Sequence, residues 1–337
     1  MVSMVIAHTA PVGGVFNVTE FLTMPWFALL MGCGLALAWQ RTKARDPGTP
    51  WWWFGVTGTL RGLVLIALGE LLDPVYDQVL VVLQYLVCAQ IAAVWLTPLL
   101  GSRPRLGWAL TVAVWLGGAP VVQAAIALQT TIRTGWRGTL LQWLAAGPDY
   151  RAITMLVWML GGISMMAGRA APRAEGSARS LRWAVALTGV TAVWQLVGKL
   201  AFPDTFLPYS GTLFETGHNL VLALAASLWC RWLAERFPAV VDRAAAVSAL
   251  GRLALTGYVA QLLVLEEVQR LVLHGARDDH WWVLGVTVAV LLGGAWAWER
   301  LGWPRPVEAV PRAMVTGADW LRHRWTTRAA RHAHHVP

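Results

Sequence analysis

Apolar segments long enough to cross a lipid bilayer follow one another along most of this chain. A bilayer core about 30 Å thick requires roughly 20 apolar residues in a helix. About ten such segments can be placed, at residues 1–16, 21–40, 56–73, 78–100, 107–127, 151–168, 183–202, 215–234, 248–272 and 281–299. Because the lipid core offers no water to backbone N–H and C=O groups, these segments are expected to be helices. The pattern predicts an all-α, polytopic integral membrane protein of about ten transmembrane helices.

Arginine and lysine occur mainly in every second gap between the segments. One set of gaps, together with the C-terminal tail, holds most of the 27 basic residues, and the other set holds Arg133, Arg137, Arg151, Lys199, Arg270 and Arg277. The loops that carry the positive charge face the cytoplasm in membrane proteins. We therefore expect a multi-pass protein of the cell (plasma) membrane with both termini in the cytoplasm. Residues 1–300 would form the transmembrane domain and residues 301–337 a basic cytoplasmic tail.

Composition excludes a soluble globular domain and argues against nucleic acid as a partner. The chain is 57% hydrophobic and only 13% charged, whereas soluble domains carry about 25% charged residues. The formal net charge is +9, but the arginines are dispersed among short loops and do not gather on one soluble face. The expected surroundings are membrane lipid, and a homodimer or a larger membrane complex remains open.

The first apolar segment is unusually short. Met1 opens directly into an apolar run, and Pro11-Val12-Gly13-Gly14 follows soon after His8. About two helical turns precede His8, which is too little to reach the cytoplasmic face at 1.5 Å per residue. We expect an incomplete first helix that results from a misplaced or truncated start; an unusual half-span is the alternative.

His8 is the sharpest single candidate for chemistry. It lies in Ala7-His8-Thr9-Ala10-Pro11, near the outer end of the first segment. Histidine acts as a general base near neutral pH, and in lipid it needs a polar cavity or a partner. An interface histidine that is hydrogen-bonded to a loop is the alternative.

Glu215 and His218 form the second candidate, at the outer end of the eighth segment. They are three residues apart, so on a helix they share a face. Together with His8 they would make an acid/base set, or they could form a structural hydrogen-bonded cluster. No third ligand has a recognisable spacing, so no metal site is expected.

Arg61 and Arg252 form the third candidate, on the predicted cytoplasmic side. Arg61 is placed at the start of the third segment, and Arg252 opens the ninth within Gly251-Arg252-Leu253-Ala254-Leu255-Thr256-Gly257-Tyr258. Guanidinium groups bind phosphate oxygens in a bidentate manner, so this pair would suit a nucleotide pyrophosphate. Ordinary positive-inside arginines are the alternative.

Several short segments, taken in order, carry a resemblance to a known family. They are Ala7–Pro11, Phe27–Leu37, Arg61-Gly62-Leu63 through Leu68-Gly69, Pro208-Tyr209-Ser210-Gly211 with Phe214-Glu215, Gly251–Tyr258, and Arg305-Pro306-Val307-Glu308. The chain resembles bacterial membrane proteins related to heparan-α-glucosaminide N-acetyltransferase and the wider YeiB-like and acyltransferase-3-like group. The resemblance covers almost the whole chain.

The resemblance implies a membrane acyltransferase of ten or eleven helices. Such enzymes take an acyl group, typically acetyl, from cytoplasmic acyl-CoA and pass it to a glycan or glycolipid across the membrane. His8 matches a first-helix histidine of the group, and Arg61 and Arg252 would hold the acetyl-CoA or other acyl-CoA donor. Glu215 and His218 would orient His8 or the acceptor, and no metal cofactor is implied.

The chain also departs from the pattern of that group. It begins after an Asp-x-x-Arg-Gly segment that related sequences carry, it has Tyr209 and Gln261 where they often have histidines, and Arg305 replaces a glycine. These departures motivate an alternative: a degenerate, non-catalytic member that acts as a subunit or scaffold of a membrane complex. A transporter or lipid flippase is the third hypothesis; it would require broken helices at mid-membrane, and the sequence shows no convincing pair of them.

Overall fold

The computed structural model describes residues 2–9, 17–75, 81–129, 131–132, 135–167, 176–203, 205–274 and 280–317. Within these ranges all regular structure is helical. The elements are α1 (Val2–Thr9), α2 (Asn17–Arg45), α3 (Trp51–Leu72), α4 (Leu83–Leu100), α5 (Pro104–Gln129), α6 (Trp136–Leu141), the π-helical turn η2 (Gln142–Ala146), α7 (Ala152–Met166), α8 (Gly176–Ala201), α9 (Leu213–Arg236), α10 (Pro238–Arg243), α11 (Ala245–Arg252), α12 (Ala254–Val268), the π-helical turn η3 (Gln269–Leu273) and α13 (Trp281–Arg300). A last helix covers residues 306–317.

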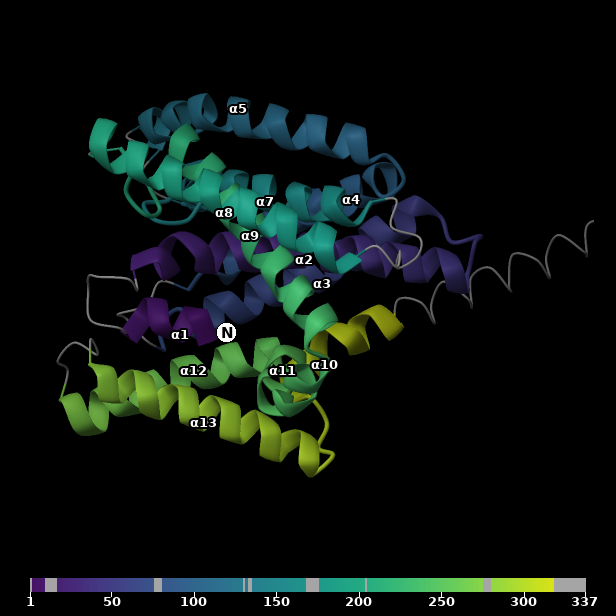
Figure 1. Ribbon diagram of the computed structural model, residues 1–337, viewed down its shortest axis with the longest axis vertical. Helices are drawn as coiled ribbons and strands as arrows, with labels where there is room; N and C mark the ends of the chain where they lie inside the picture. The colour runs from purple at the N-terminus through teal and green to yellow at the C-terminus, as the bar shows by residue number, and fades with distance from the viewer. Residues whose placement is uncertain are drawn as a thin grey trace, which may run out of the picture.

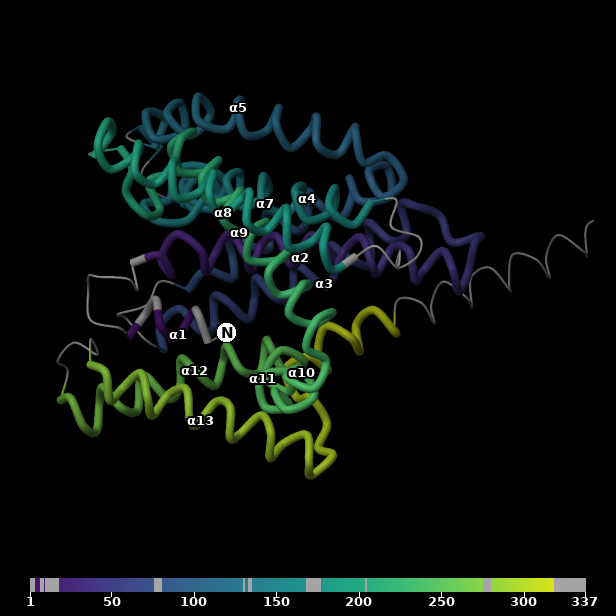
Figure 2. Tube along the Cα trace, in the orientation of Figure 1, coloured from purple at the N-terminus to yellow at the C-terminus, as the bar shows by residue number. Residues whose placement is uncertain are grey.

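The helices form a bundle with two flanks (Figure 1). Helices α5 and α8 lie on one side, α11 to α13 lie on the other, and α2 and α3 run between them. α7 packs against α2, α4 and α5, and α9 packs against α8 and α2. The short helix α1 contacts both α2 and α13, so it joins the centre of the bundle to the second flank (Figure 2).

Six helices are long and apolar enough to cross a membrane: α2, α3, α4, α5, α8 and α13. The number rises to seven if α11 and α12 together form one bent span. Every predicted segment from residue 21 onward contains a helix, but α7 and α9 are not among the spanning candidates. α7 has only 15 residues, or about 22 Å of helix, which is shorter than the roughly 30 Å lipid core.

Burial separates the central helices from the peripheral ones. In the most apolar stretch of α4, 61% of the residues are buried, against 17% in α8 and 22% in α5 and α13. The outer helices therefore expose leucine, valine and tryptophan side chains over most of their surface, among them Leu116, Val193 and Val290. Such a surface would be unfavourable in water and is suited to lipid.

A very close helix contact joins α2 to α7 through two glycines. A Cβ atom on Gly32 would lie 2.0 Å from the carbonyl oxygen of Met159, and one on Gly162 would lie 2.0 Å from that of Leu29. The Cys33 thiol also donates to the Gly162 carbonyl at 3.5 Å. Small residues let two membrane helices approach until their backbones touch. Neither glycine can therefore accept a side chain unless the two helices move apart.

One helix is broken, which the sequence did not reveal. α11 and α12 meet at Leu253 with a bend of 94°. The bend leaves the first N–H groups of α12 without helical partners. Glu308 supplies an acceptor: its Oε1 accepts from the backbone N–H of Leu255 at 3.1 Å and of Thr256 at 3.0 Å, and its Oε2 accepts from the Thr256 hydroxyl at 2.5 Å. The carboxylate that stabilises the break is more than fifty residues away along the chain, so local sequence patterns miss it.

We predict that Gly32→Ala and Gly162→Ala each lower the free energy of unfolding by about 1–3 kcal/mol, because the added methyl group overpacks the α2–α7 contact. Gly34→Ala is the matched control in the same helix, since a Cβ there meets nothing within 4 Å. The control is expected to be neutral or slightly stabilising, because alanine favours helix over glycine. Thermal unfolding of the purified variants in detergent measures the difference; equal midpoints for all three would contradict the assigned contact.

Candidate functional site

The turn that precedes α9 holds the backbone in an unusual conformation. Tyr209 has φ 63° and Gly211 has φ 66°, in the left-handed region that costs a non-glycine residue roughly 1–2 kcal/mol. Thr212 caps the helix, because its hydroxyl oxygen accepts from the backbone N–H of Glu215 at 3.2 Å. Glu215 in turn accepts from the backbone N–H of Gly211 at 3.2 Å. Cap and carboxylate together fix the turn to the start of the helix.

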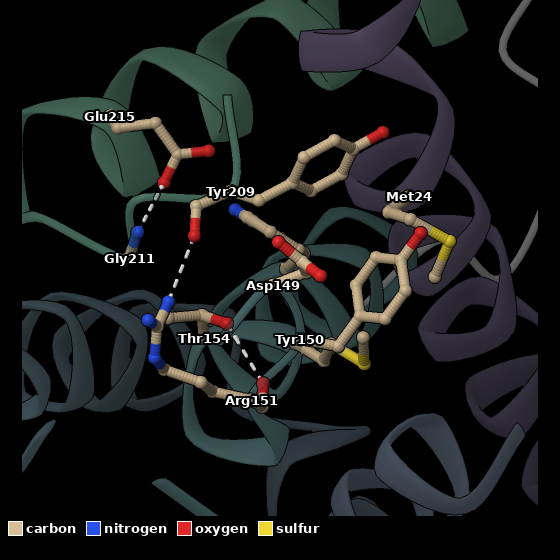
Figure 3. Close-up of a pocket in the computed structure, with 10 residues that line it drawn as sticks. Met24, Asp149, Tyr150, Arg151, Thr154, Tyr209, Gly211 and Glu215 are labelled. Carbon is tan, nitrogen blue, oxygen red and sulfur yellow. Dashed lines mark hydrogen bonds between the residues drawn. The ribbon is translucent and has the colours of Figure 1, made fainter. Parts of the chain in front are cut away.

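Arg151 supports the same turn from the other side (Figure 3). It precedes α7 and is only 6% exposed. Its Nη1 donates to the Tyr209 carbonyl at 2.9 Å, and its Nη2 donates to the Pro148 carbonyl at 3.0 Å. The carboxylates of Glu215 and Asp149 provide the compensating negative charge. A buried guanidinium is tolerated only with such partners, so Arg151 and Glu215 stabilise the turn as a unit.

Asn219 connects Glu215 to His218. The Asn219 amide donates to Glu215 Oε1, and the His218 Nδ1–H donates to Asn219 Oδ1 at 2.9 Å. The structure therefore joins the two predicted site residues through Asn219, which follows His218 on α9 and bonds to both. All three side chains are buried. The shared helix face suggested by their spacing is occupied by this hydrogen-bonded chain.

His218 faces aromatic rings. Its side chain is 0% exposed, and its ring lies 5.1 Å from that of Phe206, 5.5 Å from Phe21 and 6.5 Å from Trp194, measured between centroids. Its Nε2 has no hydrogen-bond partner among the described residues. His218 lines none of the cavities described below.

Glu215 lines a very small cavity, which we name the Glu215 pocket. Its walls include Met24, Asp149, Tyr150, Arg151 and Tyr209 (Figure 3). Its volume is about 10 Å³, close to the minimum that a single water molecule requires. Tyr150 and Tyr209 pack with ring centroids 5.4 Å apart. Burial raises the pKa of both tyrosines, so their hydroxyls remain available to donate hydrogen bonds.

A much larger cavity, the apolar hollow, lies between α2, α3, α4 and α12. Its volume is about 390 Å³, and most of its lining is apolar, including Met4, Phe27, Met31, Leu65, Leu83 and Leu86. The polar members of its lining are Arg61, Gln90, Arg252, Tyr258 and Glu308. The two arginines that the sequence singled out therefore border one cavity. Met24 lines both this hollow and the Glu215 pocket, so its flexible side chain separates the two spaces.

A second large cavity, the polar hollow, adjoins the apolar one. It measures about 520 Å³ and is lined by Thr42, Arg45, Asp46, Thr49, Trp53 and Thr57, among others. Leu35, Ala38, Arg61 and Gln90 line both hollows. Arg61 and Gln90 thus stand at the junction between a polar space and an apolar one.

Arg61 lies farther along its helix than the sequence predicted. The sequence placed it at the cytoplasmic start of a span, whereas α3 begins at Trp51 and has 22 residues. Arg61 is therefore halfway along the helix, about 15 Å from its first residue. The predicted start of this helix at residue 56 was too late, because the tryptophans at 51–53 belong to the helix. The Arg61 side chain is exposed and lines both hollows.

Arg61 and Gln90 have no partners within the described part of the chain. Arg61 makes no hydrogen bond or ion pair there, and the nearest charge that acts on it is that of Arg312, which is also positive. Gln90 is 4% exposed and forms no hydrogen bond to described residues. Both side chains line the apolar and the polar hollow, so their N–H groups can donate to a polar or anionic group that enters either space.

Arg252 is already paired. Its guanidinium makes a bidentate contact with Glu299, with Nε donating at 2.6 Å, and Arg305 lies 3.7 Å from the same carboxylate. The two arginines therefore differ in their pairing. Arg61 has no ion-pair partner among the described residues, whereas the charge of Arg252 is neutralised by Glu299. Both border the apolar hollow.

The predicted first-segment histidine can be placed only in part. His8 belongs to α1, and its side chain lies outside the described residues. Gln261, which stands where the resembling group often has a histidine, is 0% exposed with neither side-chain amide atom hydrogen-bonded. Among described residues no three histidine, cysteine or acidic side chains come together as a metal site.

Sequence reasoning missed three residues that organise these sites. Arg151 was seen only as one of few basic residues on the predicted outer side, and nothing in the sequence links it to Tyr209. Gln90 carries no signal beyond being an amide within an apolar run. Glu308 was noticed within Arg305-Pro306-Val307-Glu308, but its contact with Gly251–Tyr258 required the structure. Two of the segments that carry the family resemblance are therefore in contact.

Comparison of the chain with models of known protein families, with curated proteins and with solved structures gives no match.

We predict that Arg151→Ala lowers the free energy of unfolding by about 3 kcal/mol, because it leaves the Tyr209 turn and the Glu215 carboxylate without their buried cation. Arg151→Lys should lower the free energy of unfolding by a smaller amount, since lysine keeps the positive charge but cannot bridge two carbonyls. Arg137→Ala, at an exposed arginine, is the control. Denaturant titration monitored by tryptophan fluorescence is the measurement, and a stability of Arg151→Ala equal to that of the control would overturn the assignment.

Proposed function

We propose that the chain is an integral-membrane acyltransferase that moves an acyl group from cytoplasmic acyl-CoA to a glycan or glycolipid acceptor. The observation that carries the proposal is the unpartnered Arg61 at the junction of a polar and an apolar hollow. CoA carries phosphates and a nucleotide at one end and an acyl thioester at the other. The polar hollow, with Arg45, Trp53 and several threonines, suits the nucleotide end. The apolar hollow suits the acyl end.

The proposed arrangement leads the acyl group towards His8. The acceptor oxygen or nitrogen attacks the thioester carbonyl carbon, a C–O or C–N bond replaces the C–S bond, and CoA leaves as the thiol after it receives a proton. His8 takes the proton from the acceptor as general base, or carries the acyl group transiently. Glu215 and His218 fix the outer end of α9 near the acceptor, and Arg252 borders the donor hollow. Holding both substrates in one space supplies much of the rate enhancement.

The proposal includes a topology. About ten membrane segments, with α7 and α9 as central spans surrounded by other helices, would place both termini in the cytoplasm and the chain in the plasma membrane. The burial of α7 supports this assignment, because eleven of its residues are buried. A helix sheltered by others does not have to match the full lipid thickness by itself.

A second candidate is a non-catalytic subunit or scaffold of a membrane complex. The observation that favours it is the environment of Tyr209 and Gln261, the two residues that stand where the resembling group often has histidines. The Tyr209 carbonyl accepts a hydrogen bond from Arg151. The Gln261 amide is buried without a hydrogen-bond partner among the described residues. His218 is likewise packed among aromatic rings. These residues stabilise the bundle whether or not a reaction takes place. A transporter would use the break at Leu253, but broken spans of transporters typically occur as pairs in two repeats, and the described helices contain one such bend.

We predict that Arg61→Ala weakens binding of acetyl-CoA by about 10- to 100-fold, the loss expected for hydrogen bonds to a charged group. Arg105→Ala, at an exposed arginine of α5 outside both hollows, should bind as the unchanged protein does. His8→Ala should keep binding and lose transfer of radiolabelled acyl groups to membrane glycolipids. The absence of acyl-CoA binding, together with stable co-purification of a partner, would favour the scaffold instead.

Cysteine labelling tests the topology. In a variant without the three native cysteines, Ser102→Cys should react with a membrane-impermeant maleimide only after the cells are opened, because it follows α4 on the predicted cytoplasmic side. Thr205→Cys, which precedes α9 on the opposite side, should react in intact spheroplasts. Both positions are exposed. Labelling of both residues from the same side would contradict the proposed orientation.

A further inference from the structure

The apolar hollow has the length and the apolar lining that a hydrocarbon chain requires. The residues of α2 that border it run from Met24 to Ala38, a distance of about 21 Å along the helix axis. The polar or charged side chains of its lining are Arg61, Gln90, Arg252, Tyr258 and Glu308. Most of the other lining residues are methionine, phenylalanine, leucine and valine. An acetyl group would leave most of this surface uncovered.

We infer that the apolar hollow binds a fatty acyl chain, so that the donor is a medium- or long-chain acyl-CoA. This inference rests on the proposed function and specifies its donor. The thioester head would be held near Arg61 and Gln90, and the hydrocarbon chain would lie along α2 towards Met24. An apolar cavity of about 390 Å³ falls within the range of small-molecule sites.

Gly34 provides the space for the chain. It lines the apolar hollow, and a Cβ added to it meets no atom within 4 Å. Gly32, two residues earlier, has no such room, because Met159 occupies its side. Ala38, one turn further along α2, also borders the hollow with a small side chain. Small residues on this face widen the cavity without weakening the contact with α7.

The test measures affinity as a function of chain length. The full-length protein in lipid nanodiscs is titrated with acetyl-, butanoyl-, hexanoyl-, octanoyl- and dodecanoyl-CoA. Each buried CH₂ contributes about 0.8 kcal/mol, which corresponds to roughly a tenfold gain in affinity for every two methylenes. A dissociation constant that falls steadily with length supports the inference. A dissociation constant that is the same for acetyl- and dodecanoyl-CoA overturns it while leaving the acyltransferase proposal intact.

A variant that fills part of the apolar hollow tests where the hydrocarbon chain binds. Gly34→Leu would occupy the open space and should flatten the dependence on chain length beyond the first few carbons. Gly117→Leu is the matched control: it makes the same change on spanning helix α5, also at a glycine with nothing within 4 Å of an added Cβ, and it should keep the slope of the unchanged protein. If Gly34→Leu retains the full slope with an unchanged unfolding midpoint, the chain lies elsewhere and the inference is wrong.

Two further outcomes separate this inference from the proposed function. Failure of every acyl-CoA to bind would reject the donor and with it the acyltransferase. Displacement of bound octanoyl-CoA by phosphatidate in the nanodisc would show that the hollow takes the tail of a membrane phospholipid, which would also reject a fatty acyl donor. A dissociation constant that does not change with chain length in the unchanged protein overturns the inference by itself, so the test can fail even where a variant does not fold.

Discussion

The contact between the backbones of α2 and α7 is the constraint on which the rest of the bundle depends. Gly32 and Gly162 bring the two helices so close that carbonyl oxygens fill the positions of missing Cβ atoms. α7 in turn packs on α4 and α5, and α2 packs on α9. Without a hydrophobic driving force between helices in lipid, such close van der Waals packing is what holds membrane helices together. The hollows lie on the opposite side of α2, so their walls keep their shape because that contact is rigid.

The two halves of the proposed site differ in how they are stabilised. Around Glu215 most polar groups are paired: Arg151 donates to the Tyr209 carbonyl, and Glu215 accepts from Gly211 and Asn219. Arg61 is exposed and has no partner among the described residues. A satisfied buried network makes a structure rigid, whereas an arginine that lines two hollows can still donate hydrogen bonds. These differences favour positioning at Glu215 and, in the proposed function, ligand binding at Arg61.

Much of the fold follows from the pattern of apolar residues, and much of the site does not. The apolar segments located nine helical regions beyond residue 20, with edges up to seven residues from the observed ones, because lipid leaves the backbone no alternative to a helix. It could not find the bend at Leu253, since the stabilising carboxylate of Glu308 comes from a distant helix. It placed Glu215 and His218 on one helix but missed Asn219, which bonds to both, and the aromatic rings around His218. Side-chain direction, and not composition, decides which of these groups can meet a ligand.

The tripeptide Gly32-Cys33-Gly34 contains two glycines within one turn of α2 that have different surroundings. The first is held by the fold, because a side chain there would collide with Met159. The second faces open space in the apolar hollow. A larger side chain at residue 34 would therefore take up volume in the hollow without disturbing the contact between α2 and α7, whereas a larger side chain at residue 32 would force the two helices apart.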